Sequence, residues 1–581
     1  MADGAGDVLL ILALTLPFAS AAAALARGGL AAANLVPFAA LPALGYALLW
    51  EPGAGAGLPW LLLGAEFGLT GTTRVFLLFT AFLWTVAGFY ARSYVGAGAD
   101  ARRFFAFFGL TMAGNIGLVL ARDVASFYLF FTLMGLAAYP LVAHDGTQRA
   151  RRAGKAYLVL VLVGEAMLLP AVLLAAAASD NNLGDVPAGI AASPHRDLVV
   201  LLVLGGFGVK AGTLPLHVWL PLAHPAAPTP ASAVLSGAMV KAGLLGWLLF
   251  LPVGEADLPG WSALCVAAGL LAAFYGVLVG LTQENPKTVL AYSTISQMGL
   301  MTVGVGAALA VPQALPLALA AVAVYAAHHA LAKGALFLGV GVSEAAGGGW
   351  RRVLVVAGLL LAALALAGAP LTSGAAAKAY LKTAKEPLAA PWPEVIETFL
   401  QLGAVGTTVL MGRFLLAAWP RSDGESDGGR LSAGLWLPWA VLLAAVATLV
   451  VLLPDDVADT LDLVLSFSAL WPAVVGAALF CAGLLAVRRR GRGFGPKIPE
   501  GDLLVPALGL LGSTGRLWAS RLLPGWKALG AKASFGMGRL YDRASPRALI
   551  GRAEGSMFLW TVAASLFAVL TVALLVLVWL G

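Results

Sequence analysis

Long apolar runs separated by short polar loops recur along the whole chain. Each run holds about 20 residues, the length that an α-helix needs to cross a hydrocarbon core of roughly 30 Å. The pattern predicts about sixteen transmembrane helices, at residues 7–25, 30–50, 73–93, 103–121, 124–143, 155–178, 197–221, 228–251, 260–281, 286–309, 314–342, 353–381, 397–418, 431–452, 463–487 and 556–580. The predicted fold class is therefore an all-α, polytopic membrane protein.

Composition narrows the function classes. With 60% hydrophobic and 11% charged residues, the chain has too few charges to cover a soluble surface. Cys265 and Cys481 lie far apart in apolar runs, which excludes a thiolate-bound iron–sulfur cluster within the chain. No Gly-rich phosphate loop follows a strand pattern, so nucleotide binding has no support. We expect no cofactor in this chain and no nucleic-acid partner.

The opening stretch MADGAGDVLL lacks the basic region of a signal peptide, so we expect the first helix to be retained.

The distribution of charge predicts the topology. Basic residues gather in the loops after the odd-numbered runs: Arg27, Arg92, Arg102, Arg103, Arg149, Arg151, Arg152, Lys155, Arg351, Arg352 and the cluster at 488–492. The opposite loops hold mainly acids, among them Glu51, Glu66, Asp180 and Glu255. By the positive-inside rule the basic loops are cytoplasmic, which places both termini on the outer side of the inner (cytoplasmic) membrane.

A weak internal repeat suggests the domain organisation. AGTLPL at 211–216 recurs loosely as AGAPL at 367–371, each in a Pro-interrupted run near a lysine. The runs around them form two five-helix units, which an odd number of crossings inverts relative to each other. The predicted parts are helices 1–3 at 1–100, the two repeats at 101–251 and 252–420, helices 14–15 at 421–487, a basic lateral segment at 488–555, and an anchor helix at 556–581. The basic segment is expected along the cytoplasmic membrane face, where it binds anionic lipid or braces a partner subunit.

Several ionisable residues lie inside the predicted membrane helices: Glu165, Lys210, Lys241, His328, His329, Lys333 and Lys378. Each charge near the bilayer centre costs about 2.5 to 3.5 kcal/mol on insertion scales, so these groups need pairing, water or a function. Two structural interpretations stay open. A lysine near a helix end extends to the interface, which the neighbouring Lys382 favours for Lys378, and a buried histidine often bridges two helices.

Lys210 and Glu165 are the first candidates for a switch. Pro215 cannot donate its backbone hydrogen bond, so carbonyls one turn earlier are freed and water can enter beside the Lys210 ammonium. A nearby carboxylate favours the protonated lysine, so a change at one group alters the other. His329 and Lys333, at i and i+4, share one helix face and would extend the row of titratable groups that begins with Glu165 and Lys210.

Metal binding is the rival use of the histidines. His217, His224, His328 and His329 stand beside lysines and lack clustered carboxylates or thiolates. Divalent transition metals are usually held by imidazole together with such ligands, so we predict no metal site.

Four motifs resemble those of one family. They are GFGVKAGTLPLHVWLPLAHPAAPTPASAVLSGAMVKAGLLG at 206–246, NPKTVLAYSTISQMGL at 285–300, HALAKGALFLG at 329–339 and GAPLTSGAAAKAYL at 368–381. They resemble the antiporter-like proton-pumping subunits of respiratory complex I, formate hydrogenlyase-type membrane-bound hydrogenases and multisubunit Na⁺/H⁺ antiporters. The hydrogenase-type branch is nearest, and the resemblance covers roughly residues 70 to 420. It implies a fourteen-helix core with inverted repeats and, in some members, a lateral helix with a final anchor.

The resemblance assigns roles to residues. It makes Lys210 the broken-helix lysine, Lys241 the next relay lysine, His329 and Lys333 the central axis, and Lys378 the distal lysine, in the run that Pro370 interrupts. Two departures matter. The family has FWELMSLASY where this chain has FFTLMGLAAY, so Thr132 replaces the acid, and Ala377 precedes Lys378 where the family has serine. Either Glu165 supplies the missing acid from the next helix, or the pump is altered.

We therefore predict a proton-translocating subunit of a multisubunit membrane complex, with the path Glu165, Lys210, Lys241, His329, Lys333 and Lys378. No catalytic or redox group is expected in this chain, so other membrane subunits must supply the driving force. The alternatives are the proton path of an inorganic-carbon uptake system or of a Na⁺/H⁺ antiporter, with Na⁺ as a further ion, and a non-pumping scaffold. A membrane transferase that uses His217 and His224 as bases is a fourth reading.

Overall fold

The structure is a computed structural model. It describes residues 2–26, 34–53, 55–58, 64–96, 99–346, 349–420, 432–452, 467–490 and 498–502. Residues 1–58 and 65–501 form one compact unit. The second unit, 59–64 and 502–581, contributes only Gly64 and Asp502 to the described residues.

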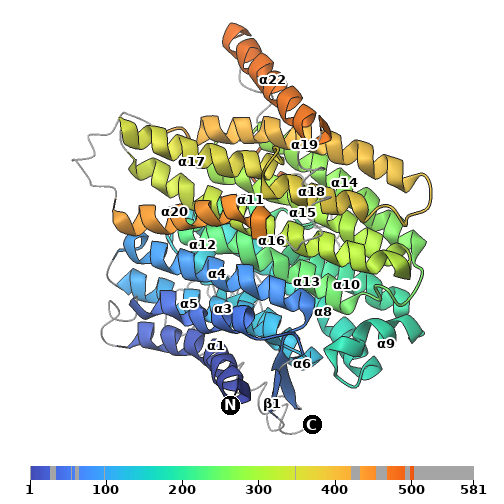
Figure 1. The fold of residues 1–581 in the computed structure, drawn as a ribbon. Coiled ribbons are helices and arrows are strands. Elements are labelled where there is room, and N and C mark those ends of the chain that lie inside the picture. Colours follow the sequence, from blue (N-terminus) through green and yellow to red (C-terminus); the bar gives the residue numbers. More distant parts are fainter. Residues whose placement is uncertain are drawn as a thin grey trace, which may run out of the picture. The chain divides into compact units, whose positions relative to one another are not determined.

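Helices make up nearly all of the described chain (Figure 1). They are α1 (Ala2–Leu25), α3 (Leu41–Leu49), α4 (Gly71–Tyr94), α5 (Ala99–Leu120), α6 (Val124–Ala137), α7 (Tyr139–Val142), α8 (Gln148–Ala178), α9 (Val186–Ala192), α10 (Arg196–Ala211), α11 (Trp219–Ala226), α12 (Thr229–Val234), α13 (Val240–Phe250), α14 (Pro259–Leu281), α15 (Pro286–Ala310), α16 (Leu315–Ala345), α17 (Trp350–Ala367), α18 (Ser373–Thr383), α19 (Trp392–Ala417), α20 (Ala433–Thr448) and α22 (Phe467–Arg490). Short turns are η1 (Val36–Ala40), η2 (Leu183–Asp185), η3 (Leu235–Met239), η4 (Pro312–Ala314) and η5 (Leu449–Leu452).

The prediction of a polytopic all-α membrane protein is confirmed. Within the described residues, thirteen helices are long and apolar enough to cross a membrane. Of the remaining expected runs, 30–50 corresponds to a shorter apolar helix at Val36–Leu49, and 197–221 is divided between α10 and α11. The run at 556–580 and most of the basic segment at 488–555 lie outside the described residues.

Two of the expected membrane crossings are interrupted by a loop. Helix α10 ends at Ala211 with Gly212 as its C-cap, and α11 begins at Trp219; α17 ends at Ala367 with Gly368 as its C-cap, and α18 begins at Ser373. Both glycines are left-handed, with φ of 72° and 80°, a conformation that other residues adopt at a cost. The loops contain Pro215 and Pro370, so the breaks fall at the two Pro-interrupted runs.

A small β-hairpin was not predicted. Strands β1 (Gly55–Leu58) and β2 (Ala65–Gly68) pair antiparallel. The Glu66 amide donates to the Asp123 carboxylate (2.9 Å), which also caps α6 by accepting from the Ser126 amide (2.7 Å). One buried acid therefore joins the hairpin to the start of α6.

The centre of the bundle is formed by α15 and α16. Every α15 residue from Thr288 to Ala310 is buried. Glycines bring its backbone against α14: a methyl group on Gly269 or Gly299 would lie 2.5 Å from the carbonyl oxygen of the other, and one on Gly276 would lie 2.5 Å from that of Tyr292. Small residues at such contacts let membrane helices approach closely.

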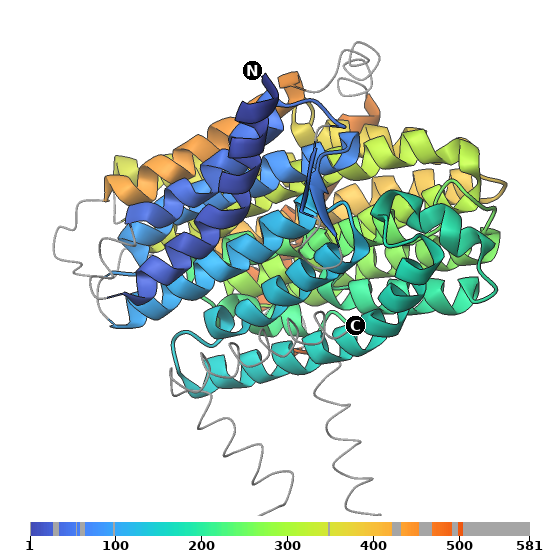
Figure 2. The same ribbon diagram turned by 90° about the horizontal axis from the view of Figure 1, so that it is seen from below.

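Helix α8 lies at the margin of the bundle, where Figure 2 shows it in cyan. Its outward face carries exposed apolar side chains, including Leu162, Leu169 and Leu173. Its opposite face packs on α10 and α6. An apolar outer face of this kind suits lipid or a neighbouring subunit.

Candidate functional site

Glu165 projects from α8 towards α6. The Thr132 hydroxyl donates a hydrogen bond to its carboxylate (2.8 Å), and the Tyr128 side chain also bonds to it. Thr132 and Tyr128 lie one turn apart on α6, so both reach the same acid. The carboxylate thus lies directly beside Thr132, the position where the resembling family carries its glutamate.

Lys210 lies in the last turn of α10 and is buried, with 3% of its surface exposed. Its ammonium donates to the Tyr157 hydroxyl (3.1 Å), which in turn donates to the Gly135 carbonyl (2.8 Å). The rings of Tyr157 and Phe131 lie 5.2 and 5.9 Å from the ammonium, within the range of a cation–π interaction. A cation at this end of α10 also interacts favourably with the helix dipole.

Gly135 shows how close Lys210 and Glu165 are. A methyl group placed on Gly135 would lie 3.4 Å from Lys210 Nζ and 3.8 Å from Glu165 Oε1. Both groups therefore border one small space, and each acts electrostatically on the other. The structure thus brings together the two residues that the sequence paired.

The central group consists of Lys241 on α13 with His329 and Lys333 on α16. The Lys241 ammonium contacts His329 Nδ1 and donates to the Ser236 carbonyl (2.6 Å). Lys333 donates to the Leu290 carbonyl (2.7 Å) and to the Ser293 hydroxyl on α15. All three side chains are buried, and both lysines act electrostatically on the histidine.

A wide turn precedes Lys241. Residues Leu235–Met239 form a π-helical turn between α12 and α13. Its Ser236 carbonyl accepts from Lys241, and the Ser236 hydroxyl pairs with that of Thr294 on α15 (2.8 Å). π-turns inside helices are frequent at functional sites. The sequence SGAMVK gave no signal that would have predicted this turn.

The distal group links α16 to α18. His328 Nδ1 and the Ser373 hydroxyl share a hydrogen bond of 2.8 Å. Lys378 donates to the Ala367 carbonyl at the end of α17, and its charge acts on His328. Ala377 is buried at the position before this lysine. A methyl group on Gly368 would lie 2.7 Å from the Lys378 ammonium, so the left-handed glycine makes room for it.

The His224 ring makes no hydrogen bond to these groups among the described residues, although Lys241 and Lys333 act electrostatically on it. His217, in the α10–α11 loop, packs edge-on against Tyr275, with ring centroids 5.2 Å apart. His224 on α11 stacks on Phe337, with centroids 4.5 Å apart. Both are fully buried. Within the described ranges, no group of three or more His, Cys, Asp or Glu side chains is placed to hold a metal ion.

The predicted site residues therefore form three groups. His328 and His329 are adjacent on α16, and His328 acts electrostatically on His329, so the central and distal groups are neighbours. Among the residues that the structure describes, no direct hydrogen bond joins Lys210 to Lys241. A proton passing between these two lysines needs water or side-chain movement.

Sequence reasoning missed several polar residues at these groups. Tyr128 and Tyr157 surround Glu165 and Lys210, and they read as ordinary aromatic residues of apolar helices. Lys382 and Lys385 both form ion pairs with Glu397 on α19, with each ammonium 2.9 Å from a carboxylate oxygen. The charges alone were visible in the sequence, but the contact between α18 and α19 was not.

Comparison with known proteins places these features in context. Residues 121–384 match the transmembrane family described as NADH:quinone oxidoreductase/Mrp antiporter. The chain is 35% identical over 261 residues to hydrogenase-4 component B of Escherichia coli, covering 43% of this chain and 38% of that protein. It is 30% identical over 347 residues to the putative antiporter subunit mnhA2 of Staphylococcus haemolyticus, covering 55% and 43%. The matched stretch thus spans less than half of each of these relatives.

A solved structure shares the fold. The Mrp complex from a Dietzia species superposes with a TM-score of 0.72 at 24% identity, covering 90% of this chain and 63% of that one. The breaks in α10–α11 and α17–α18 and the three buried groups lie wholly or largely within the region that the family comparison matches.

Proposed function

We propose that this chain, whose residues 121–384 match the transmembrane family described as NADH:quinone oxidoreductase/Mrp antiporter, is an antiporter-like subunit that conducts protons within a multisubunit energy-coupling complex. One observation carries the proposal. Lys210, Lys241, His329 and Lys378 are buried in an apolar helical bundle, and the partly buried Glu165 lies next to Lys210. Buried ionisable residues of this kind are costly, and in membrane proteins they mark ion or proton pathways.

The first step is a change of charge at Glu165 and Lys210. A negative carboxylate holds the proton on the lysine, and a change at the carboxylate releases it. Thr132 and Tyr128 bond to Glu165 and fix its place beside α6. This arrangement supports the hypothesis that Glu165 replaces the acid that the family carries at the Thr132 position.

The proton then moves through the central and distal groups. Imidazole titrates near neutral pH and can both accept and donate, so His329 and His328 suit transfer between lysines. The contacts Lys241–His329 and His328–Ser373 outline this direction. Lys378 is the last buried cation, and it acts electrostatically with Lys382, which pairs with Glu397 nearer the surface.

The partners follow from the chemistry. The path itself supplies no energy, so other membrane subunits must bias the charge at Glu165 and Lys210. By the positive-inside rule we expect the start of α8 on the cytoplasmic side of the inner membrane and both termini on the outer side. We expect the basic residues of 488–555 to bind anionic lipid on that side.

Replacement of Lys210 tests the function. In vesicles that contain the whole complex, Lys210→Gln should abolish proton uptake measured with a pH-sensitive dye, while the subunits still assemble. Arg196→Gln, at the exposed start of the same helix, is the matched control and should leave uptake unchanged. Unimpaired uptake in Lys210→Gln would favour the scaffold alternative.

A second candidate function is the proton path of a cation/proton antiporter. The relative mnhA2, a putative antiporter subunit, matches over 55% of this chain and favours it. Proton movement that requires Na⁺ on the opposite side of the vesicle would support this candidate. Movement that is independent of Na⁺ and needs a redox partner would support the hydrogenase-like complex.

A further inference from the structure

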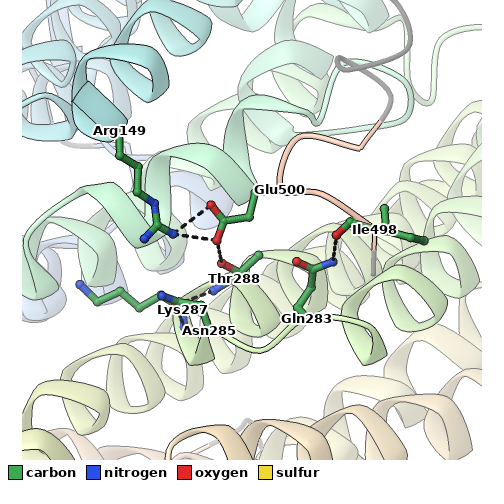
Figure 3. Close-up of polar contacts among 7 residues, drawn as sticks. All are labelled: Arg149, Gln283, Asn285, Lys287, Thr288, Ile498 and Glu500. Carbon is green, nitrogen blue, oxygen red and sulfur yellow. Dashed lines mark hydrogen bonds and ion pairs between the residues drawn. The ribbon is translucent and has the colours of Figure 1, made fainter. Parts of the chain in front are cut away.

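Arginines at the face where α8 and α15 begin are of two kinds. Arg149 is paired: in Figure 3 its guanidinium faces the Glu500 carboxylate, to both oxygens of which it donates (2.7 and 2.9 Å). The Thr288 hydroxyl donates to the same carboxylate (3.1 Å). Arg351 and Arg352, in the first turn of α17, are different. Neither guanidinium has a hydrogen bond or an ion pair with another residue that the structure describes.

The start of α17 lies at this same face, next to the end of α19. Helix α17 begins shortly after α16 ends at Ala345. Ser343, in the last turn of α16, donates to the Ala418 carbonyl just after α19 (2.6 Å). Its neighbour Glu344 acts electrostatically on Lys287, in the first turn of α15. By the positive-inside rule we expect this face to be cytoplasmic.

Each of the two arginines lies against an exposed tryptophan ring. Arg351 Cζ is 5.9 Å from the centroid of the Trp350 ring, and Arg352 Cζ is 5.0 Å from that of Trp419, distances typical of a cation–π interaction. The two tryptophans are 69% and 48% exposed, and tryptophan is enriched at the headgroup level of membranes. A ring supplies no oxygen acceptor. The guanidinium donors therefore remain available for a phosphate, which arginine binds through two parallel hydrogen bonds.

Apolar side chains continue from Trp350 along one face of α17. They recur every three or four residues and so form a single stripe, whose exposed members are Val353, Leu354, Ala357, Leu360, Leu361 and Leu364. At 1.5 Å per residue the stripe from 350 to 364 is about 21 Å long, more than the roughly 15 Å of hydrocarbon in one leaflet. Cations and aromatic rings at one end and aliphatic side chains along the rest match the chemistry of a phospholipid.

We propose that the start of α17 and the end of α19 bind one anionic phospholipid. Arg351 and Arg352 donate to its phosphate, the Trp350 and Trp419 rings lie beside the headgroup, and an acyl chain follows the apolar stripe. Two arginines without an acidic partner among the described residues favour a lipid of net negative charge over a zwitterionic one. The site shares no residue with the three buried groups, so it is tested by lipid binding and not by proton flux.

Photolabelling by lipid tests the site. Phosphatidylglycerol or phosphatidylcholine with the same photoreactive acyl chain is titrated into the whole complex in detergent, and labelled peptides are identified by mass spectrometry. Phosphatidylglycerol should label residues 350–364 at a lower concentration than phosphatidylcholine. The double variant Arg351→Gln with Arg352→Gln should raise the half-saturating phosphatidylglycerol concentration by about thirtyfold, and each single variant by about fivefold, the scale of an arginine at an anionic membrane surface.

Two further variants separate this site from the general charge of the face. Arg149→Gln is the matched control: it removes an arginine that Glu500 already holds, so residues 350–364 should be labelled as in the wild type. Trp350→Leu keeps an apolar side chain but removes the ring, and it should weaken labelling by about threefold, the scale of an exposed cation–π contact. Assembly of every variant is checked by co-purification of the other subunits.

Several results would overturn the proposal. A wild-type half-saturating concentration in the double arginine variant would remove the phosphate site. Equal labelling of the wild type by the two lipids would mean that the stripe meets bulk lipid without choosing a headgroup. An equal loss in Arg149→Gln would assign the effect to the charge of the whole face. A wild-type stripe that is not labelled, together with loss of a co-purifying subunit in the double variant, would assign the surface to a protein neighbour.

Discussion

The two interrupted crossings share a backbone design but differ in what faces their lysine. In each, a left-handed glycine caps the end of one helix, Gly212 after α10 or Gly368 after α17, and a second helix follows. Lys210 faces the carboxylate of Glu165, whereas Lys378 rests on the Ala367 carbonyl and acts electrostatically with another cation, Lys382. The same kind of break therefore holds a lysine paired with an acid in one half of the protein and a lysine without a neighbouring acid in the other. A buried lysine without a neighbouring carboxylate releases its proton more readily than one that is paired with an acid.

Removal of the acid at the first break should have the largest effect. Glu165→Gln keeps the size and the contact to Thr132 but removes the charge, so we expect at least a hundredfold loss of proton flux, the scale for a proton-transfer group. Restoring an acid next door sharpens the test. Because Thr132 touches the Glu165 carboxylate, Thr132→Glu in the Glu165→Gln background should recover flux. A double variant as inactive as Glu165→Gln would contradict the relocated acid.

Loss of the lysine at the second break should matter less. Lys378→Gln keeps a donor for the Ala367 carbonyl, and Lys382 lies one turn further along α18, so we expect a smaller loss than the roughly hundredfold typical of an obligatory proton-transfer group. Stopped-flow measurement of vesicle acidification would compare the proton flux of Lys378→Gln with that of Lys210→Gln. Equal losses in the two variants would mean that both breaks act as obligatory stations.

The glycines at the breaks allow a matched comparison of stability. Gly212→Ala and Gly368→Ala both place a side chain at positive φ, which costs about 1 kcal/mol of folding free energy. The added methyl group also meets Leu220 in one case and the flexible Lys378 ammonium in the other. We expect both to lower the thermal midpoint, and Gly368→Ala to reduce flux additionally. A Gly368→Ala protein with normal flux would show that the Ala367 contact is dispensable.

The smallest effect is expected at the outer cluster. Glu397 is 30% exposed and pairs with Lys382 and Lys385. Partly exposed ion pairs contribute about 0 to 1 kcal/mol, so Glu397→Gln should leave stability nearly unchanged and alter flux by less than about twofold. A hundredfold loss would instead place Glu397 among the obligatory groups.

Much of this organisation could be predicted from sequence because helix length and apolar composition are local properties. The pairing of Glu165 with Lys210 was also accessible, since two opposite charges in adjacent apolar helices have few other partners. The β-hairpin was not accessible, because its strands are short and rich in glycine. Nor was the contact of Glu500 with Arg149, which joins residues 351 positions apart. Such contacts depend on the packing of several helices and leave no periodic pattern in the chain.

The glycine contacts between α14 and α15 have a mechanical consequence. Where two backbones touch at Gly269, Gly276 and Gly299, neither helix can slide or tilt without collision of main-chain atoms. The two helices therefore move as one rigid body. Lys333 is bound to that body by its hydrogen bonds to the Leu290 carbonyl and the Ser293 hydroxyl. Proton transfer at the central group must then proceed by rotation of side chains and rearrangement of solvent, rather than by movement of α14 and α15.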